Sequence, residues 1–573
     1  MEKRVQIPWF KRVVVGVFLF SILINVLYLT GSLFMLQIYD RVIPSRNIAT
    51  LTGLVGLATG LYVIQALLDV VRSRIFVRLA RAFDQSMGPK VFDAVVTFPL
   101  MAQRVGDGLQ PMRDVATVRG FLAGGGPAVL FDLPWLPFFL ALCFLFHFLI
   151  GLTATIGACV LLCLSIASEI LTRGPVKQGA LFHSRQLGLA GAAQRNAESL
   201  VSMGMTRSVR ERWLAANDEQ AAFQTRGSDV AGSLGAISKA FRFGLLSAVL
   251  AVGAYLVINQ QATGGIIIAS SILTARALAP AEQVISQWKG AIAAHQSWIR
   301  LQAMMKALPS DSDRVALPAP VATLDVEDLA VRAPGGAKTI VNGVRFKLKA
   351  GEALGIIGPS GSGKSSLVRA LAGVWPAANG AVRLDGAPLN QWDRERLGAH
   401  IGYLPQDVEL FAGTIAENIG RLQSPVESAA VIQAARSAGV HDMILRFDAG
   451  YETQVGDSGV LLSKGQRQRI ALARALYSEP FLVILDEPNS NLDQEGDEAL
   501  TDAIHGVKAR GGIAIVVAHR PNVIGAVDHV MMMMDGRMQT FGAKDDVLKR
   551  VLARPPMPSA ATLNVGGPPA APK

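Results

Sequence analysis

Eight consecutive residues from Gly358 to Ser365, with the sequence GPSGSGKS, carry the clearest chemical signal in the chain. Their spacing fits G-x-x-x-x-G-K-[ST], a glycine-rich loop whose backbone amides surround phosphate groups at the start of a helix. We expect Lys364 to reach the β- and γ-phosphates of a nucleotide and Ser365 to bind Mg²⁺. The alternative is a chance glycine loop. The expected binding residues are Gly358, Pro359, Ser360, Gly361, Ser362, Gly363, Lys364, Ser365 and Ser366.

A second signal is a pair of carboxylates at the end of the apolar run Phe481–Leu485. Asp486 is placed to support Mg²⁺, and Glu487 is placed to act as a base on an attacking water molecule. Two acids at a strand end can also be ordinary solvated turn residues. The phosphate loop upstream favours the catalytic interpretation, in which ATP and Mg²⁺ are the cofactors.

Short apolar runs position these groups. Ala353–Ile357, Phe481–Leu485 and Ile513–Val517 alternate with helical segments, which predicts an α/β domain with a largely parallel sheet. We place this nucleotide-binding domain at residues 323–553. A linker at 306–322 precedes it, and a tail at 554–573, rich in Pro, Gly and Ala, is predicted to be disordered.

The N-terminal half has the composition of a membrane domain. The chain is 51% apolar and only 17% charged, which indicates several membrane spans. We predict an α-helical, six-span domain at 1–305, with helices that continue well into the cytosol. The predicted spans are 13–36, 48–70, 127–147, 149–171, 243–260 and 265–287.

The net charge of +11 is concentrated in the membrane half, with a balance of +12 in residues 1–300 and −1 in the remainder. Basic residues follow the second and fourth predicted spans, among them Arg72, Arg74 and Arg173. The positive-inside rule explains this excess and leaves no need for nucleic acid as a partner. It places the N-terminus and everything after the sixth span in the cytoplasm.

Further motifs make the C-terminal domain similar to an ABC-type ATPase. Leu462-Ser-Lys-Gly-Gln466 resembles the ABC signature, Gln406 the Q-loop glutamine, Asp493 the D-loop aspartate and His519 the switch histidine. The resemblance implies a homodimer with two ATP molecules between its ATPase domains, each touching the phosphate loop of one chain and the signature of the other. It gives catalytic roles to Glu487, His519, Gln406 and Asp493, nucleotide contacts to Ser463, Gly465 and Gln466, and Mg²⁺ to Ser365, Gln406 and Asp486.

Two positions depart from the family pattern. Lys464 replaces the first glycine of the signature, so it either places a cation near the γ-phosphate or points its stem into solvent, and we favour the second. Val331-Arg-Ala-Pro-Gly335 contains no aromatic residue where many members stack a tyrosine on adenine.

The membrane half is similar to the type I secretion ABC transporters, in the branch that exports metalloproteases and haemophores. The similarity is carried by Tyr39-Asp-Arg-Val-Ile-Pro-Ser-Arg46, Phe131-Asp-Leu-Pro-Trp-Leu-Pro137, His147, Arg195-Asn-Ala-Glu198 and Met203-Gly-Met205. It implies a multi-pass protein of the bacterial inner membrane, surrounded by membrane lipid, that exports a protein with a C-terminal signal. The implied partners are a periplasmic membrane-fusion protein, an outer-membrane channel protein and the secreted substrate.

Other functions remain open at this point. No cysteine-peptidase domain precedes the first span, which argues against exporters that trim a leader peptide. A lipid- or drug-exporting half-transporter is the principal alternative. A membrane scaffold with an inactive ATPase is disfavoured, because Lys364, Asp486, Glu487 and His519 are all present.

Polar residues in the predicted spans have two interpretations. Asp132, Glu169 and Arg276 could line a substrate path, since ionisable groups in membranes often do. Asp132 could instead cap or turn a helix, and Arg276 could snorkel or bind lipid. Pro134 and Pro137 are expected to kink the third span.

Overall fold

The computed structural model describes residues 10–101, 108–307, 317–336, 338–490, 492–518 and 520–552. The chain divides into two compact units, one made of residues 1–99 and 104–308 and the other of 100–103 and 309–573. His519, the predicted tail at 554–573 and most of the predicted linker at 306–322 lie outside the described residues.

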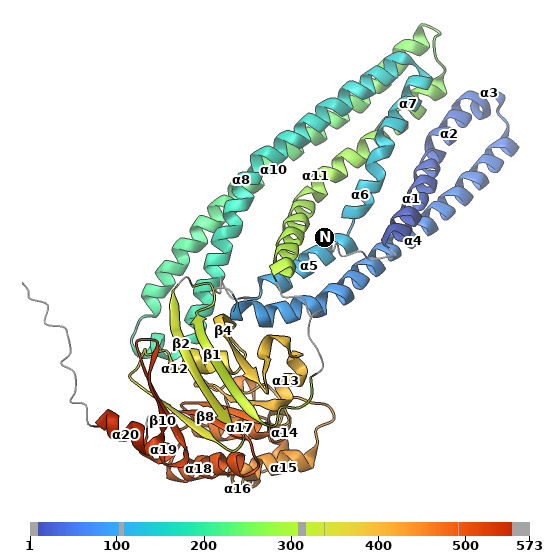
Figure 1. Ribbon diagram of the computed structural model, residues 1–573. Coiled ribbons are helices and arrows are strands. Elements are labelled where there is room, and N and C mark those ends of the chain that lie inside the picture. Colours follow the sequence, from blue (N-terminus) through green and yellow to red (C-terminus); the bar gives the residue numbers. More distant parts are fainter. Residues whose placement is uncertain are drawn as a thin grey trace, which may run out of the picture. The chain divides into compact units, whose positions relative to one another are not determined.

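The first unit is entirely helical over its described residues (Figure 1). Six helical segments are long and apolar enough to cross a membrane, and they coincide with the six predicted spans: Val14–Ser45, Ile48–Leu100, Gly126–Phe146, Phe148–Arg195, Thr206–Ile258 and Gly264–Val284. The elements are α1 (Phe10–Leu27), α2 (Thr30–Gln37), a π-helix (Ile38–Val42), α3 (Ile43–Ser45), α4 (Ile48–Thr97), a 3₁₀ turn (Phe98–Leu100), α5 (Gln110–Ala123), α6 (Gly126–Asp132), a 3₁₀ turn (Leu133–Trp135), α7 (Leu136–Phe146), α8 (Phe148–Arg195), α9 (Ala197–Ser202), α10 (Thr206–Ile258) and α11 (Gly264–Ala307).

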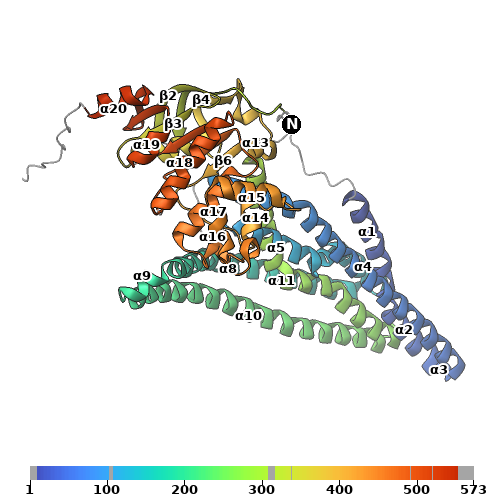
Figure 2. The same cartoon turned by 90° about the horizontal axis from the view of Figure 1, so that it is seen from below.

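Three of these helices are much longer than a membrane is thick. α4, α8 and α10 contain 50, 48 and 53 residues. At 1.5 Å per residue each is about 70–80 Å long, whereas a hydrocarbon core is about 30 Å thick. α8 and α10 pack against each other along their length (Figures 1 and 2). The extensions predicted from the basic, helix-forming stretches are therefore continuous with the spans.

Side-chain caps start two of the spans. The Asn47 side chain accepts a hydrogen bond from the backbone N–H of Thr50 at 3.1 Å, and α4 begins there. Nδ1 of His147 accepts from the N–H of Leu149 at 3.1 Å, where α8 begins. Such caps satisfy amides that a helix cannot pair internally. His147 therefore has a structural role as the cap at the start of the fourth span.

The second unit contains two sheets. A six-stranded sheet has the order β10-β9-β3-β8-β7-β6, in which β3, β6, β7, β8 and β9 are parallel and β10 is antiparallel. A four-stranded antiparallel sheet has the order β2-β1-β4-β5. The strands are β1 (Thr323–Arg332), β2 (Thr339–Lys349), β3 (Ala353–Ile357), β4 (Ala377–Leu384), β5 (Ala387–Pro388), β6 (Ile401–Leu404), β7 (Leu482–Asp486), β8 (Ile513–Val517), β9 (His529–Met534) and β10 (Arg537–Ala543).

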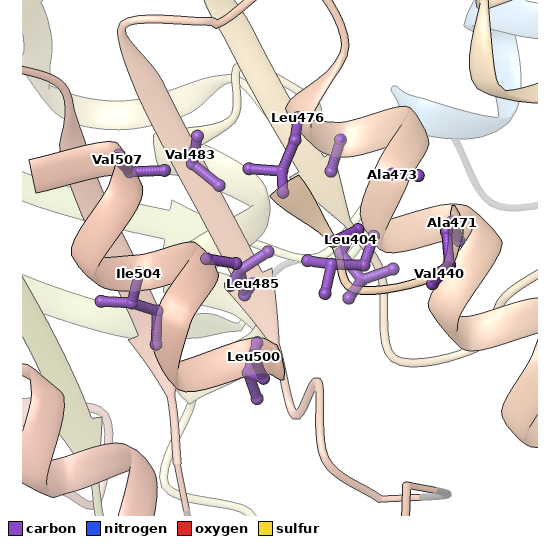
Figure 3. Close-up of a cluster of buried hydrophobic side chains, with 14 of the residues drawn as sticks. Leu404, Val440, Ala471, Ala473, Leu476, Val483, Leu485, Leu500, Ile504 and Val507 are labelled. Atoms are coloured by element: carbon purple, nitrogen blue, oxygen red, sulfur yellow. The ribbon is translucent and has the colours of Figure 1, made fainter. Parts of the chain in front are cut away.

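Helices cover the six-stranded sheet and enclose its core. Figure 3 shows Leu404 of β6 and Val483 and Leu485 of β7 among side chains from α17 and α18, such as Leu476 and Ile504. β7 and β8 are buried at every residue, which explains their unbroken apolar runs. The helices are α12 (Lys364–Leu371), α13 (Arg394–His400), α14 (Ile415–Ile419), α15 (Ser428–Ser437), α16 (His441–Leu445), α17 (Lys464–Leu476), α18 (Gln494–Ala509), α19 (Pro521–Ala526) and α20 (Lys544–Leu552).

Candidate nucleotide site

The glycine-rich loop connects β3 to the N-terminus of α12, as its spacing predicts. Gly358 has φ 149° and Gly363 has φ 93°, a backbone region that favours glycine. A Cβ on Gly358 would lie 2.2 Å from the carbonyl oxygen of Met533, so no larger residue fits there without a shift. The backbone amides at the start of α12 supply the partial positive charge that attracts phosphate.

The side chain of Lys364 folds back onto the glycine-rich loop. Its Nζ donates hydrogen bonds to the carbonyl oxygens of Gly358 at 2.8 Å and Pro359 at 2.9 Å. Burial lowers the pKa of the Lys364 ammonium, and the nearby carboxylates of Glu487 and Asp486 partly offset this effect. The cation is therefore pre-positioned at the phosphate loop by two backbone acceptors.

Asp486 ends β7 beside Ser365. The Ser365 hydroxyl donates to Oδ1 of Asp486 at 3.2 Å, while Oδ2 is buried and has no hydrogen-bond partner among the residues that the structure describes. Burial raises the pKa of the Asp486 carboxyl, and the Ser365 hydrogen bond opposes that rise. A buried acceptor without a partner is costly, and a hard cation that binds oxygen ligands would satisfy it.

Glu487 and Gln406 meet at the ends of adjacent strands. Nε2 of Gln406, two residues after β6, donates to Oε2 of Glu487 at 3.1 Å. Glu487 has φ 49°, a left-handed conformation that costs a non-glycine residue about 1–3 kcal/mol. Strain of this kind is concentrated at functional sites, which agrees with the predicted role of Glu487.

The signature residues form the N-terminus of α17. Ser463 and Gln466 make a capping box: Oγ of Ser463 accepts from the N–H of Gln466 at 3.2 Å, and Oε1 of Gln466 accepts from the N–H of Ser463 at 2.9 Å. Gly465 is half-buried and Lys464 is exposed, which agrees with a lysine stem that points into solvent. The signature thus lies at a helix N-terminus, the kind of place where backbone amides can bind an anion.

One residue of the site was not found from the sequence. Gln468 is 3% exposed on α17, and its Nε2 donates to the carbonyl oxygens of Glu487, at 3.4 Å, and of Pro488. The side chain therefore holds the loop that carries the candidate base. Its neighbours in the sequence gave no sign of this, because the contact joins residues 19 positions apart.

Asp493 lies at the N-terminus of α18. Its Oδ1 accepts from the N–H of Gly496 at 3.0 Å and pairs with Arg469 of α17. The Gly496 hydrogen bond, helped by Arg469, lowers the pKa of Asp493. Arg520, next to His519 in sequence, donates to Oδ2 of Asp497 at 2.8 Å. His519 itself lies outside the described residues, so its predicted role rests on sequence.

The two units together define the class: a six-span exporter membrane domain joined to an ABC-type ATPase. Residues 14–278 match the family described as "ABC transporter transmembrane region", and residues 341–490 match "ABC transporter". A bacterial Atm1-family ABC exporter with ATP bound has the same fold, with a TM-score of 0.79 over 95% of this chain and 97% of that chain at 21% identity.

Two curated relatives narrow the class. The type I secretion system ATP-binding protein PrsD of Rhizobium meliloti is 53% identical over 94% of this chain and 92% of its own length. The cyclolysin secretion/processing ATP-binding protein CyaB of Bordetella pertussis is 28% identical over 95% of this chain and 78% of its own length. The chain belongs to the type I secretion family of ABC transporters, which makes it a multi-pass inner-membrane protein and an ATPase.

Proposed function

We propose that this chain uses ATP to export a protein that carries an uncleaved C-terminal signal. The main support is similarity to a type I secretion ATP-binding protein over 94% of this chain and 92% of that protein. The six candidate spans and the phosphate loop lie on one chain. The printed names of the relatives concern secretion of proteins, including a cyclolysin. ATP binding biases the membrane helices between two states, and cargo moves if those states bind it with different affinity.

The catalytic unit of this proposal is a homodimer. Each chain has one phosphate loop and one signature, so two chains complete two ATP sites by symmetry. The backbone amides of 358–366 would hold the phosphates of ATP, and Lys364, which now donates to the carbonyl oxygens of Gly358 and Pro359, would donate to the β- and γ-phosphates. Ser463, Gly465 and Gln466 of the partner chain close the site from the γ-phosphate side.

Mg²⁺ fits the residues at the end of β7. Ser365, Asp486 and Gln406 would hold it, and Oδ2 of Asp486, which has no partner within the described part of the chain, supports this assignment. The ion supplies charge compensation for the phosphates when bound. Glu487 would accept the proton of the attacking water, Gln406 and Asp493 would position the nucleotide and its water, and His519 would contact the γ-phosphate.

Export to the medium requires partners. Six spans cross one membrane, so the proposed pathway needs a periplasmic membrane-fusion protein and an outer-membrane channel protein. Membrane lipid surrounds the spans, and the basic excess of the membrane half is consistent with anchoring at the cytoplasmic surface. No role for nucleic acid is needed.

The test is to express the chain with its two partner proteins and a secreted protein from neighbouring genes. Cargo should reach the medium only when all components are present. Lys364→Ala in the exporter should stop export, which shows that the ATP site drives it. Removing the last several dozen residues of the cargo should also stop export. Undiminished export of that truncated cargo contradicts the C-terminal signal, and lipid flipping by the chain alone without protein export would support a lipid exporter instead.

A further inference from the structure

The Asp132 carboxylate is the centre of a buried polar cluster in the membrane unit. Its Oδ1 accepts hydrogen bonds from the hydroxyl of Ser21 at 2.7 Å, from the side-chain amide of Asn25 at 3.0 Å and from Nη1 of Arg72 at 2.9 Å. Its Oδ2 accepts from the same arginine nitrogen at 3.1 Å. The side chains of Asp132 and Arg72 are each 10% exposed. One carboxylate therefore joins α1, α4 and α6.

Arg72 has a second acidic neighbour, and a further cation on α11 contacts an aromatic ring. Nη2 of Arg72 lies 3.0 Å from Oδ1 of Asp69, and the guanidinium of Arg276, on α11, lies 4.4 Å from the ring centre of Tyr28. The sequence indicates Arg72 as a basic residue at the cytosolic end of the second span, and the structure adds that Arg72 is buried and paired with Asp132. The side chain of Asp132 makes no capping hydrogen bond at the 3₁₀ turn that follows it, and its carboxylate is an ion-pair partner instead. Ionisable groups inside membrane segments are costly and usually functional.

The pair is located where the third span is broken. α6 ends at Asp132, the backbone continues as a 3₁₀ turn over Leu133–Trp135, and α7 begins at Leu136. Pro134 and Pro137 prevent a regular α-helix here, which locates the kink that the two prolines predict. Short 3₁₀ segments inside helices often mark hinges.

The two sides of the break share α11 as a neighbour but differ in their other main partners. α6 contacts α1 as well, and the ring of Phe131 lies 6.2 Å from that of Phe76, one turn after Arg72 on α4. α7 packs against α8 as well. The ion pair is made from the α6 side of the break and attaches that side to the first two spans.

We propose that Arg72 and Asp132 are positioning residues for cargo export, because their ion pair holds the break in the third span against α1 and α4 as a pivot on which α7 moves. The proposal rests on protein export as the proposed function. A buried ion pair seldom adds net stability over an apolar pair, but it selects one geometry and penalises others, since moving one partner away leaves the other buried and uncompensated.

Spin labels on the full-length homodimer test the pivot directly. In a variant lacking Cys143, Cys159 and Cys163, one label pair is placed at Val71 of α4 and Leu130 of α6, and a second at Val63 of α4 and Leu145 of α7. These positions are 40%, 60%, 54% and 79% exposed in the single chain. Trapping the ATP state should leave the α4–α6 distance unchanged and shift the α4–α7 distance. Equal shifts in both pairs overturn the pivot.

Substitutions then separate positioning from folding. Asp132→Asn should keep basal ATPase within about twofold but lower cargo export roughly tenfold or more, because Arg72 loses the buried charge of its partner on α6. The swap Arg72→Asp with Asp132→Arg should recover part of the export. Arg119→Gln, which breaks the exposed 3.2 Å pair with Asp84, is the matched control and should export normally. The proposal is overturned if ATPase activity and export fall in parallel and the swap does not restore export. If the single variants do not fold, the spin-label distances, measured in a chain that keeps Arg72 and Asp132, still test the pivot.

Discussion

The Gln406 side-chain amide donates to the Glu487 carboxylate at 3.1 Å and thereby joins two loops whose residues are 81 positions apart. Both loops follow neighbouring parallel strands, β6 and β7, so their carboxyl ends meet at one edge of the sheet. A nucleotide that engages Glu487 must compete with this hydrogen bond. We therefore expect nucleotide binding to change the contacts of the Gln406 loop.

The first prediction concerns the base. Glu487→Gln keeps the size of the side chain but removes its proton acceptor, so ATP turnover should fall by about 10²–10⁴-fold. ATP affinity should be retained, because the phosphate loop is unchanged. Steady-state hydrolysis and nucleotide binding of the purified full-length protein measure the two effects.

The matched control for this change is Glu498→Gln. Glu498 is exposed on α18 and pairs only with Gln494 at 3.2 Å among the contacts of the described residues, so turnover should stay within about twofold of the unmodified protein. Near-normal turnover of Glu487→Gln would refute the assignment of the base.

The second prediction uses the raised pKa of Asp486. Burial raises this pKa in the folded state, while the unfolded chain has the ordinary value of about 3.9. Below about pH 3.9 both states are protonated and no stability is lost; as pH rises through the raised pKa, the folded state bears the cost of a buried charge. Asp486→Asn should therefore raise the melting temperature of the nucleotide-free protein near pH 7.5.

That stabilisation should shrink as the pH is lowered toward the ordinary carboxyl pKa. The same variant should lose most of the melting-temperature rise that MgATP gives the unmodified protein, because the proposed ion loses a carboxylate ligand. Asp385→Asn is the contrasting variant. The carboxylate of Asp385 accepts backbone hydrogen bonds from Val321 and Thr323 near the surface, so this change should lower the melting temperature. If the Asp486→Asn variant melts at a lower temperature than the unmodified protein at neutral pH, this prediction is wrong.

Much of this architecture follows from local patterns. Long apolar runs bounded by polar turns identify helices because a span needs about 20 apolar residues, and short apolar runs such as Ile513–Val517 identify strands buried on both faces. The phosphate loop is recognisable because the chemistry dictates both residue types and spacing. Each of these signals lies within a few residues of the sequence.

The features that the sequence missed are long-range. Arg72 and Asp132 are 60 positions apart, and a basic residue after an apolar run indicates a membrane boundary before it indicates a buried pair. Gln468 follows the signature by two positions, and a glutamine at such a position is typical of the exposed face of a helix. Only tertiary packing turns its side chain toward the carbonyl oxygens of Glu487 and Pro488.

Gln468 carries the third prediction. Gln468→Leu fills the same space but donates no hydrogen bonds, so the Glu487 loop loses two contacts and turnover should fall about tenfold while KM for ATP changes little. Gln494→Leu, at an exposed position of α18, is the control and should behave normally. A Gln468→Leu variant that changes stability alone, with kcat unaffected, would show that the residue is only structural.

The last prediction tests whether two chains share each ATP site. A Lys364→Ala chain has a damaged phosphate loop and an intact signature, whereas a Ser463→Arg chain has the reverse. Either variant alone should be nearly inactive, because both sites of its homodimer contain one damaged part. In an equal mixture of the two, half of the dimers are mixed, and each mixed dimer has one site with both parts intact. If sites act independently, co-expression should restore up to about a quarter of the unmodified activity.

The control is the double variant with both changes on one chain, which gives a mixed dimer without an intact site when combined with unmodified chain. Its addition should depress activity below the unmodified fraction. Mixtures of the single variants could stay inactive although crosslinking shows that mixed dimers form. In that case either one chain does not complete the ATP site of the other, or a lone intact site cannot turn over. Nucleotide trapping on the mixed dimers separates these explanations, because only the second leaves one nucleotide bound per dimer.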